Sequence, residues 1–146
     1  MNKPLRILVA DDNEDHRFFI NRALDGIEGV NLIIESVADG AAVMALLRRE
    51  GPYEDAERPN LVLLDLRMPH RNGLEVLAEM RADPTLRSIP VCVLTSSDRA
   101  SDIQAAFDKG TNAYVVKSSD IDELRKRVIE VYDFYTSTSL LPLPPP

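Results

Sequence analysis

The stretch LVLLDLRMPHRNG, residues 61–73, contains the features from which the fold of this chain can be derived. Its four consecutive apolar residues, Leu61 to Leu64, are typical of a strand buried on both faces of a parallel sheet. The apolar run ends at Asp65, Pro69 prevents the strand from continuing, and Asn72 can cap the helix that follows. Because open α/β sheets bind ligands at the carboxyl ends of their strands, Asp65 is the candidate functional centre.

Similar strand–helix units precede and follow this stretch. Apolar and β-branched runs predict strands, and apolar residues at helical spacing predict helices. The predicted strands are residues 5–10, 30–37, 61–64, 89–94 and 113–116, and the predicted helices begin after Asn13, Gly40, Asn72, Asp98 and Asp120. Five alternating units with right-handed crossovers predict an α/β fold, namely a flavodoxin-like (βα)5 doubly wound parallel sheet with strand order 2-1-3-4-5.

We expect residues 1–135 to form a single domain and residues 136–146 to form a Pro-rich C-terminal tail. The three terminal prolines favour an extended polyproline conformation over further folded structure. Such a tail can bind the aromatic groove of a partner, remain free or dock in a dimer, and the sequence leaves these alternatives open. The polar loop at residues 51–59 is longer than most connections between a helix and a strand.

The composition restricts the cellular setting and the partners. The net charge of −7 argues against non-specific binding to nucleic acid or to anionic membranes. Neither a signal pattern nor an apolar run of membrane-spanning length is visible. Cys92, the single cysteine, lies in an apolar run and is expected to be a buried, inert thiol. We therefore expect a cytoplasmic protein without nucleic-acid or membrane partners.

Polar residues stand at the ends of four predicted strands. They are Asp11 and Asp12 after the first strand, Asp65 after the third, Thr95 at the end of the fourth and Lys117 after the fifth. In the strand order 2-1-3-4-5 the first and third strands are neighbours, so the three carboxylates are expected to share one cleft. Carboxylates this close repel one another, and a divalent cation relieves the repulsion. A set of oxygen ligands with open positions favours Mg²⁺.

This set of residues suits the transfer of a phosphoryl group to an aspartate. A carboxylate such as that of Asp65 can attack phosphorus and form an acyl phosphate. The oxygens of the transferred group must be neutralised and held in line, and Mg²⁺, the Lys117 ammonium and the Thr95 hydroxyl each meet part of that need. Taken alone, Thr95 could instead be a turn residue and Lys117 a solvated loop residue.

Over about residues 4–133 the sequence resembles the receiver domains of two-component response regulators. The resemblance rests on ILVADDN (7–13), LLDLRMPHRNG (63–73), VLTSS (93–97) and AYVVK (113–117), which occur in order at the family's spacings. It implies that Asp65 is the phosphoacceptor. The other roles that it implies are metal binding by Asp11, Asp12, Asp65 and the main-chain carbonyl of Arg67, phosphoryl binding by Thr95 and Lys117, switching by the aromatic Tyr114, and modulation of acyl-phosphate hydrolysis by Arg67 and Ser97.

One position departs from the family pattern. Most receivers have a proline after the lysine, in a cis peptide bond, whereas Ser118 follows Lys117 here. A cis bond before a non-proline residue costs roughly 2.5–4 kcal/mol, so we expect a trans bond or a rearranged loop. With the 51–59 loop and the C-terminal segment, this resembles the single-domain regulators that pair with bacterial and cyanobacterial phytochrome histidine kinases. The resemblance implies a sensor histidine kinase as partner and a homodimer formed by the last helix and the tail.

Two other functions are compatible with parts of the sequence. A phosphatase that uses Asp65 as nucleophile needs a second acid two residues later, and Arg67 stands there instead. A pseudo-receiver would keep the fold as a binding scaffold without being phosphorylated, and the complete acceptor set argues against it. We therefore expect a phosphorylation switch and not a turnover enzyme. Tyr114 could also be a packing residue, and His16 and His70 are expected at the surface because they lack partners at metal-ligand spacing.

Overall fold

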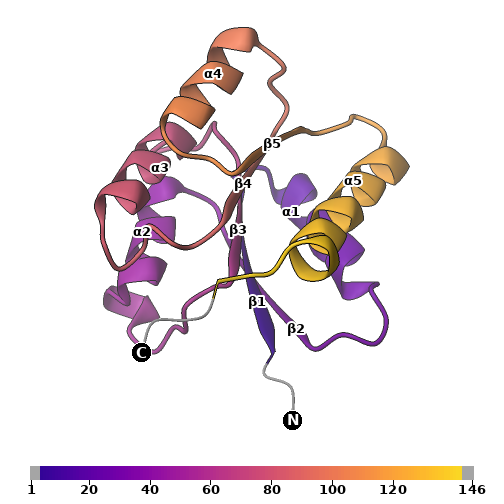
Figure 1. Cartoon of the computed structure of the whole chain (residues 1–146), viewed down its shortest axis with the longest axis horizontal. Coiled ribbons are helices and arrows are strands. Elements are labelled where there is room, and N and C mark those ends of the chain that lie inside the picture. The colour runs from indigo at the N-terminus through magenta and orange to yellow at the C-terminus, as the bar shows by residue number, and fades with distance from the viewer. Residues whose placement is uncertain (1–3, 143–146) are drawn as a thin grey trace.

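The computed structural model describes residues 4–142, in which one five-stranded sheet is covered by helices (Figure 1). All neighbouring strands are parallel, and their order is β2-β1-β3-β4-β5. The strands are β1 (Leu5–Ala10), β2 (Leu32–Val37), β3 (Leu61–Leu64), β4 (Val91–Thr95) and β5 (Ala113–Val116). The helices are α1 (Glu14–Asp25), α2 (Gly40–Arg48), α3 (Gly73–Ala82), α4 (Ala100–Asp108) and α5 (Ile121–Asp133), with a short 3-10 helix at Gly51–Tyr53. The predicted fold class and strand order are therefore confirmed.

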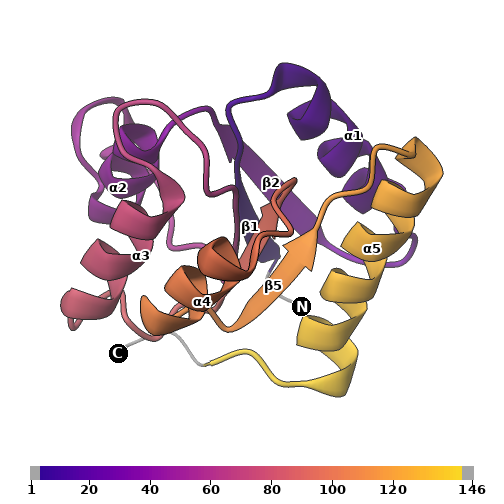
Figure 2. The ribbon, with the colours of Figure 1, turned by 90° about the horizontal axis from the view of Figure 1, so that it is seen from above.

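Two helical layers enclose the sheet (Figures 1 and 2). α1 and α5 pack together on one face, and α2, α3 and α4 lie on the other. Each strand sends alternate side chains into the two resulting cores. In β1, Ile7 and Val9 belong to the core beneath α1 and α5, whereas Leu8 and Ala10 belong to the core beneath α2, α3 and α4. Burial on both faces explains why the central strands β3 and β4 are nearly continuous apolar runs in the sequence.

The helix caps agree with the prediction except at α4. The side-chain oxygens of Asn13, Asn72 and Asp120 each accept a hydrogen bond from the N–H three residues later. The cap predicted at Asp98 is wrong, because α4 is capped one residue later by Arg99, whose side chain makes no capping hydrogen bond. Ser97 supplies part of the missing cap, since its hydroxyl oxygen accepts a 3.3 Å hydrogen bond from the Arg99 N–H.

Two glycines allow α2 and α3 to approach the loop that follows β3. A Cβ atom on Gly73 would lie 2.8 Å from the Cα of Leu66 and would overlap the Asp65 carbonyl. A Cβ atom on Gly40 would overlap the backbone carbonyl of Arg71. Only a residue without a side chain fits at such close approaches. The loop after Asp65 is therefore held between the starts of two helices.

The C-terminal segment stays helical for longer than predicted. α5 ends at Asp133, and the chain continues as a short π-helix over Phe134–Thr138, so residues 136–138, which were predicted to belong to the extended tail, are helical. Leu141 packs against the core beneath α1 and α5. Residues 143–146 lie outside the described part of the chain, and the division at residue 135 into a domain and a Pro-rich tail stays a prediction.

The peptide bond after Lys117 and the Cys92 thiol are as predicted. Among residues 4–142 no peptide bond is cis, so the bond between Lys117 and Ser118 is trans. Cys92 is completely buried in β4, and this burial raises the pKa of its thiol to about 12. Over the same described residues, no helix combines the length and the apolar character that crossing a membrane requires.

Candidate functional site

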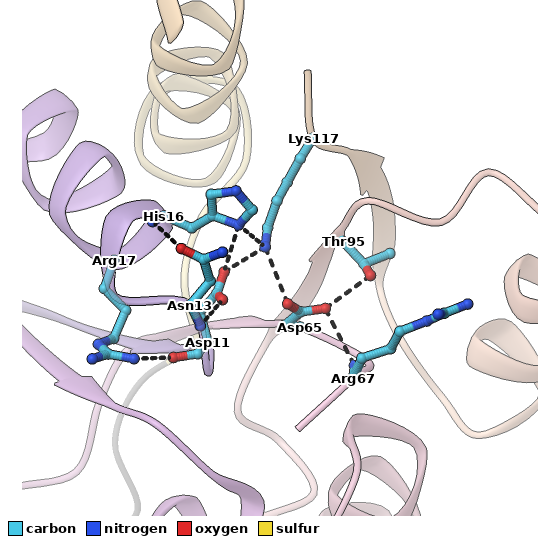
Figure 3. Close-up of polar contacts among 8 residues, drawn as sticks. All are labelled: Asp11, Asn13, His16, Arg17, Asp65, Arg67, Thr95 and Lys117. Carbon is cyan, nitrogen blue, oxygen red and sulfur yellow. Dashed lines mark hydrogen bonds and ion pairs between the residues drawn. The ribbon is translucent and has the colours of Figure 1, made fainter. Parts of the chain in front are cut away.

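The polar residues predicted at the strand ends meet in one cleft at the carboxyl edge of the sheet (Figure 3). Ala10 pairs with Leu64 across β1 and β3, which sets Asp11 beside Asp65. Between β4 and β5, the Lys117 N–H donates a 2.7 Å hydrogen bond to the Thr95 carbonyl. The resulting cleft has a volume of about 380 Å³, and its lining includes Asp12, His16, Asp65, Thr95 and Lys117.

The Asp65 carboxylate is held through both of its oxygens. Its Oδ1 accepts a 2.8 Å hydrogen bond from the Thr95 hydroxyl and a 3.3 Å hydrogen bond from the Arg67 N–H. Its Oδ2 lies 3.0 Å from the Lys117 ammonium nitrogen. Only 6% of Asp65 is exposed, so the carboxylate reaches solvent through the cleft alone. These contacts orient a weakly accessible carboxylate between a hydroxyl and a cation.

Three carboxylates form the acidic end of the cleft. Asp11, Asp12 and Asp65 each present an oxygen within 4.8 Å of the others. Burial raises the pKa of the Asp11 carboxyl, and the Lys117 ammonium and the Asn13 N–H act against that rise. Oδ2 of Asp11 lies 2.5 Å from the Lys117 nitrogen as an ion pair, yet it has no aligned hydrogen-bond donor. A buried oxygen that lacks a donor, within a cluster of three carboxylates, fits a hard divalent cation.

The two residues predicted to modulate the site both line the cleft around Asp65. The Arg67 side chain extends away from the acceptor, and its backbone N–H is the group that faces the carboxylate (Figure 3). Ser97 connects β5 with α4: its carbonyl accepts a 2.8 Å hydrogen bond from the Tyr114 hydroxyl, and its own hydroxyl donates to Asp102 at 2.5 Å. Tyr114 is half-buried. Tyr114 and Ser97, predicted separately, are thus in direct contact.

His16 is the residue that the sequence interpretation missed. It was expected at the surface, but its side chain is only 33% exposed, and its Nδ1 lies 2.9 Å from the Lys117 ammonium nitrogen (Figure 3). One sequence feature could have indicated that His16 lies at the site: it stands in the first turn of the helix that follows Asp11 and Asp12. His70, in contrast, is exposed as predicted.

One protein family matches most of the chain. The response regulator receiver domain family matches residues 7–129 of the chain. The chain belongs to this family. Response regulator Rcp1 of Synechocystis sp. (strain ATCC 27184 / PCC 6803 / Kazusa) is 37% identical to the receiver over 141 residues, which cover 97% of this chain and 95% of Rcp1.

Two solved structures of response regulators resemble the receiver over nearly its whole length. The crystal structure of the phosphorylated cyanobacterial phytochrome response regulator RcpA has a TM-score of 0.92 and 40% identity, covering 97% of this chain and 100% of RcpA. The Mn(2+)-bound form of response regulator Rcp1 has a TM-score of 0.90 and 36% identity, covering 96% of this chain and 100% of Rcp1. The receiver fold and the family resemblance derived from the sequence are both confirmed.

Proposed function

We propose that this receiver is a single-domain response regulator that accepts a phosphoryl group on Asp65 from a sensor histidine kinase. The observation that carries the proposal is the arrangement of the Asp65 carboxylate between the Thr95 hydroxyl and the Lys117 ammonium, beside two further carboxylates. Each partner serves a separate need of phosphoryl transfer to a carboxylate: orientation, charge neutralisation and cation binding.

In the transfer step, a carboxylate oxygen of Asp65 attacks the phosphorus of a phosphohistidine. The new oxygen–phosphorus bond forms as the nitrogen–phosphorus bond breaks, and the electron pair of the broken bond stays on the leaving imidazole nitrogen. Asp11, Asp12, Asp65 and the Arg67 carbonyl would hold Mg²⁺, which supplies neutralising charge to the phosphoryl oxygens when bound. Lys117 donates to one phosphoryl oxygen, and the Thr95 hydroxyl donates to another.

The switch follows from the contacts around Thr95. Its hydroxyl now donates to the charged Asp65 carboxylate, and after phosphorylation the charge lies on the phosphoryl oxygens, which then become the stronger acceptors for the same donor. Thr95 lies two residues before Ser97, which is bonded to Tyr114 in β5 and to Asp102 in α4. A shift at Thr95 therefore biases the face formed by α4, β5 and α5. Arg67 and Ser97 modulate how quickly water hydrolyses the acyl phosphate.

The proposed partners are a histidine kinase, in particular a phytochrome kinase, and a second copy of the chain. The phytochrome pairing is supported by the likeness to RcpA, which is a phytochrome response regulator. The homodimer would use α5 and the segment after it, where Phe134 and Leu140 are 50% and 91% exposed. We place the protein in the cytoplasm, where the ATP that charges the kinase is found.

The test is Mg²⁺-dependent labelling of the chain by acetyl phosphate, followed by intact-mass spectrometry. We expect one phosphoryl group per chain, no label after Mg²⁺ is chelated, and no label in Asp65→Asn, whose amide is a poor nucleophile. Asp98→Asn is the matched control, because Asp98 is an exposed acid in the loop before α4, and it should be labelled like the wild type. Wild-type chain that takes no label would indicate a pseudo-receiver, and consumption of many equivalents per minute would indicate a phosphatase.

A further inference from the structure

The contact between His16 and Lys117 takes no direct part in the transfer of the phosphoryl group to Asp65. These residues are separated by 101 positions in the sequence, and Nδ1 of the imidazole lies 2.9 Å from the ammonium nitrogen. The Lys117 side chain is only 3% exposed, whereas that of His16 is 33% exposed. His16 therefore forms the outer side of the pocket that surrounds the ammonium group.

The start of α1 determines where the His16 ring lies. Asn13 caps this helix, and its side-chain oxygen accepts a 3.0 Å hydrogen bond from the His16 N–H. The Asn13 N–H is itself bonded to Oδ1 of Asp11 at 2.9 Å, so the helix start is tied to the end of β1. The backbone of His16 is thus anchored to the acidic end of the cleft, and the imidazole projects from the first turn of α1 towards Lys117 (Figure 3).

The chemistry of the ammonium group determines what the imidazole does there. A lysine ammonium has N–H donors and no acceptor, and at short range Lys117 forms ion pairs with Asp11 and Asp65 and contacts His16. Nδ1 of His16 must therefore accept a hydrogen bond, which leaves the ring proton on Nε2. His16 contacts the ammonium through a ring nitrogen, whereas Asp11 and Asp65 contact it through carboxylate oxygens.

We propose that His16 is a positioning residue that holds the Lys117 ammonium in place for binding of the phosphoryl oxygen. This inference rests on the proposed function of Asp65. Phosphorylation turns the Asp65 carboxylate into an acyl phosphate, which weakens its ion pair with Lys117. A cation coordinated by the Asp11 carboxylate weakens the ion pair between Asp11 and Lys117. Neither change alters the imidazole itself, whose Nδ1 lies 4.0 Å from Oδ2 of Asp11 and closer to Lys117, so the hydrogen bond to His16 keeps its acceptor. Lys117 can then turn one N–H to a phosphoryl oxygen while His16 keeps the nitrogen in position.

The first experiment compares two substitutions at residue 16 with the wild type. His16→Leu removes the acceptor, whereas His16→Asn places an amide oxygen near the position of Nδ1. At saturating Mg²⁺ we expect His16→Leu to be phosphorylated by acetyl phosphate about tenfold more slowly, the effect of one hydrogen bond to a charged group. His16→Asn should recover most of the lost rate. Asp15→Asn, an exposed change in the same turn, controls for altered helix ends and should match the wild type.

Two further measurements separate positioning from a merely structural role. Mg²⁺ affinity, measured by calorimetry, should change by less than about twofold in His16→Leu, because the imidazole is not an oxygen ligand. Beryllofluoride, which mimics the phosphoryl group on an aspartate, should bind His16→Leu more weakly than the wild type. In a Lys117→Ala background, His16→Leu should cause no additional loss of beryllofluoride affinity, because the group that it positions is absent.

The outcomes distinguish this inference from the proposed function. If the wild type is labelled and His16→Leu is labelled at the same rate, the positioning role is wrong while Asp65 remains the acceptor. An equal loss of beryllofluoride affinity with and without Lys117 would also overturn the role, since His16 would then act through other residues. If the wild type takes no label, the proposed function itself fails.

Discussion

The Thr95 hydroxyl donates a 2.8 Å hydrogen bond to Oδ1 of Asp65, so the residue that is proposed to sense the phosphoryl group already contacts the acceptor. The other carboxylate oxygen is engaged by Lys117 at 3.0 Å. Because a bond to phosphorus withdraws charge from the oxygen that forms it, phosphorylation of either oxygen weakens the contact which that oxygen makes. Asp65 is therefore coupled to Thr95 and Lys117 before phosphorylation. A substitution at Thr95 or Lys117 should change the properties of the Asp65 carboxylate.

Lys117→Ala should lower stability and raise metal affinity together. The substitution leaves the buried carboxylates of Asp11 and Asp65 without their cation, which should cost about 3 kcal/mol in the free energy of unfolding without Mg²⁺. Mg²⁺ should bind the variant more tightly than the wild type, because the ammonium no longer competes for Oδ2 of Asp11. Urea unfolding with and without Mg²⁺ measures both effects.

The control for this experiment is Lys126→Ala, which removes an exposed lysine from α5. It should change the free energy of unfolding by less than about 0.5 kcal/mol, and Mg²⁺ should stabilise it as it does the wild type. Weaker Mg²⁺ binding by Lys117→Ala than by the wild type would contradict the competition between the ammonium and the cation.

Arg81 should be among the largest single contributors of a polar side chain to stability. Its guanidinium donates to the carbonyls of Gly110, Arg87 and Ile89 and to the Asn112 side chain at 2.8 to 3.0 Å. Arg81→Met would leave several of these acceptors unpaired and should cost about 2–3 kcal/mol. Arg81→Lys should recover little, because one ammonium cannot reach acceptors on separate segments.

The matched control for Arg81 is Arg87→Met, an exposed position in the neighbouring loop. Its carbonyl accepts from Arg81, and a side-chain substitution leaves that carbonyl in place. Chemical denaturation should show Arg87→Met within about 0.5 kcal/mol of the wild type. Equal losses for the two variants would mean that the four hydrogen bonds of Arg81 are not the cause.

Gly40→Ala and Gly26→Ala should have opposite effects on stability. The Cβ at residue 40 would overlap the Arg71 carbonyl, and relieving that overlap should cost about 2 kcal/mol or more. Gly26 has a right-handed helical backbone, and its nearest contact would be at 3.4 Å, so alanine there should stabilise the fold by about 0.5 kcal/mol. Thermal unfolding of the two variants gives the comparison, and a tolerated Gly40→Ala would show that the loop can move away.

The Cys92 thiol should be unreactive in the native protein. It is completely buried, and its pKa is raised to about 12 from an ordinary value of 9.0. At about pH 8 a disulfide reagent should label it only as fast as the chain unfolds. An exposed thiol introduced as Ser101→Cys in a Cys92→Ala background should react at once. Rapid labelling of wild-type Cys92 would reveal local opening of β4.

The same thiol makes stability fall at high pH. Between about pH 9 and pH 12 the unfolded chain loses the thiol proton while the folded chain keeps it. Ionisation of the thiol then favours the unfolded state. The resulting loss in the free energy of unfolding is absent below pH 9 and grows as the pH rises. Cys92→Ala should show a shallower loss of stability over this range in denaturant titrations.

Much of the cleft was predictable because its residues directly follow the strands. Once the apolar runs are parallel strands in one sheet, Asp11, Asp65 and Lys117 must lie at the same edge, whatever the details of packing. The caps at Asn13 and Asn72 were predictable for a similar reason, since a cap depends on residues three positions apart. The Asp98 cap was wrong because several adjacent polar residues could start that helix, and Ser97 makes the local hydrogen bonds to the Arg99 N–H and to Asp102 in its place.

The sequence by itself determined the order of the elements, the two-sided burial of the sheet and the acidic centre, because these follow from local patterns of apolar and polar residues. Only the tertiary structure decided which side chains outside those patterns touch. Arg81 reaches an acceptor 31 residues away, and His16 reaches Lys117 across 101 residues. Such contacts depend on how α1 and α3 pack against the sheet. Many side chains determine that packing jointly, so no short sequence motif predicts it.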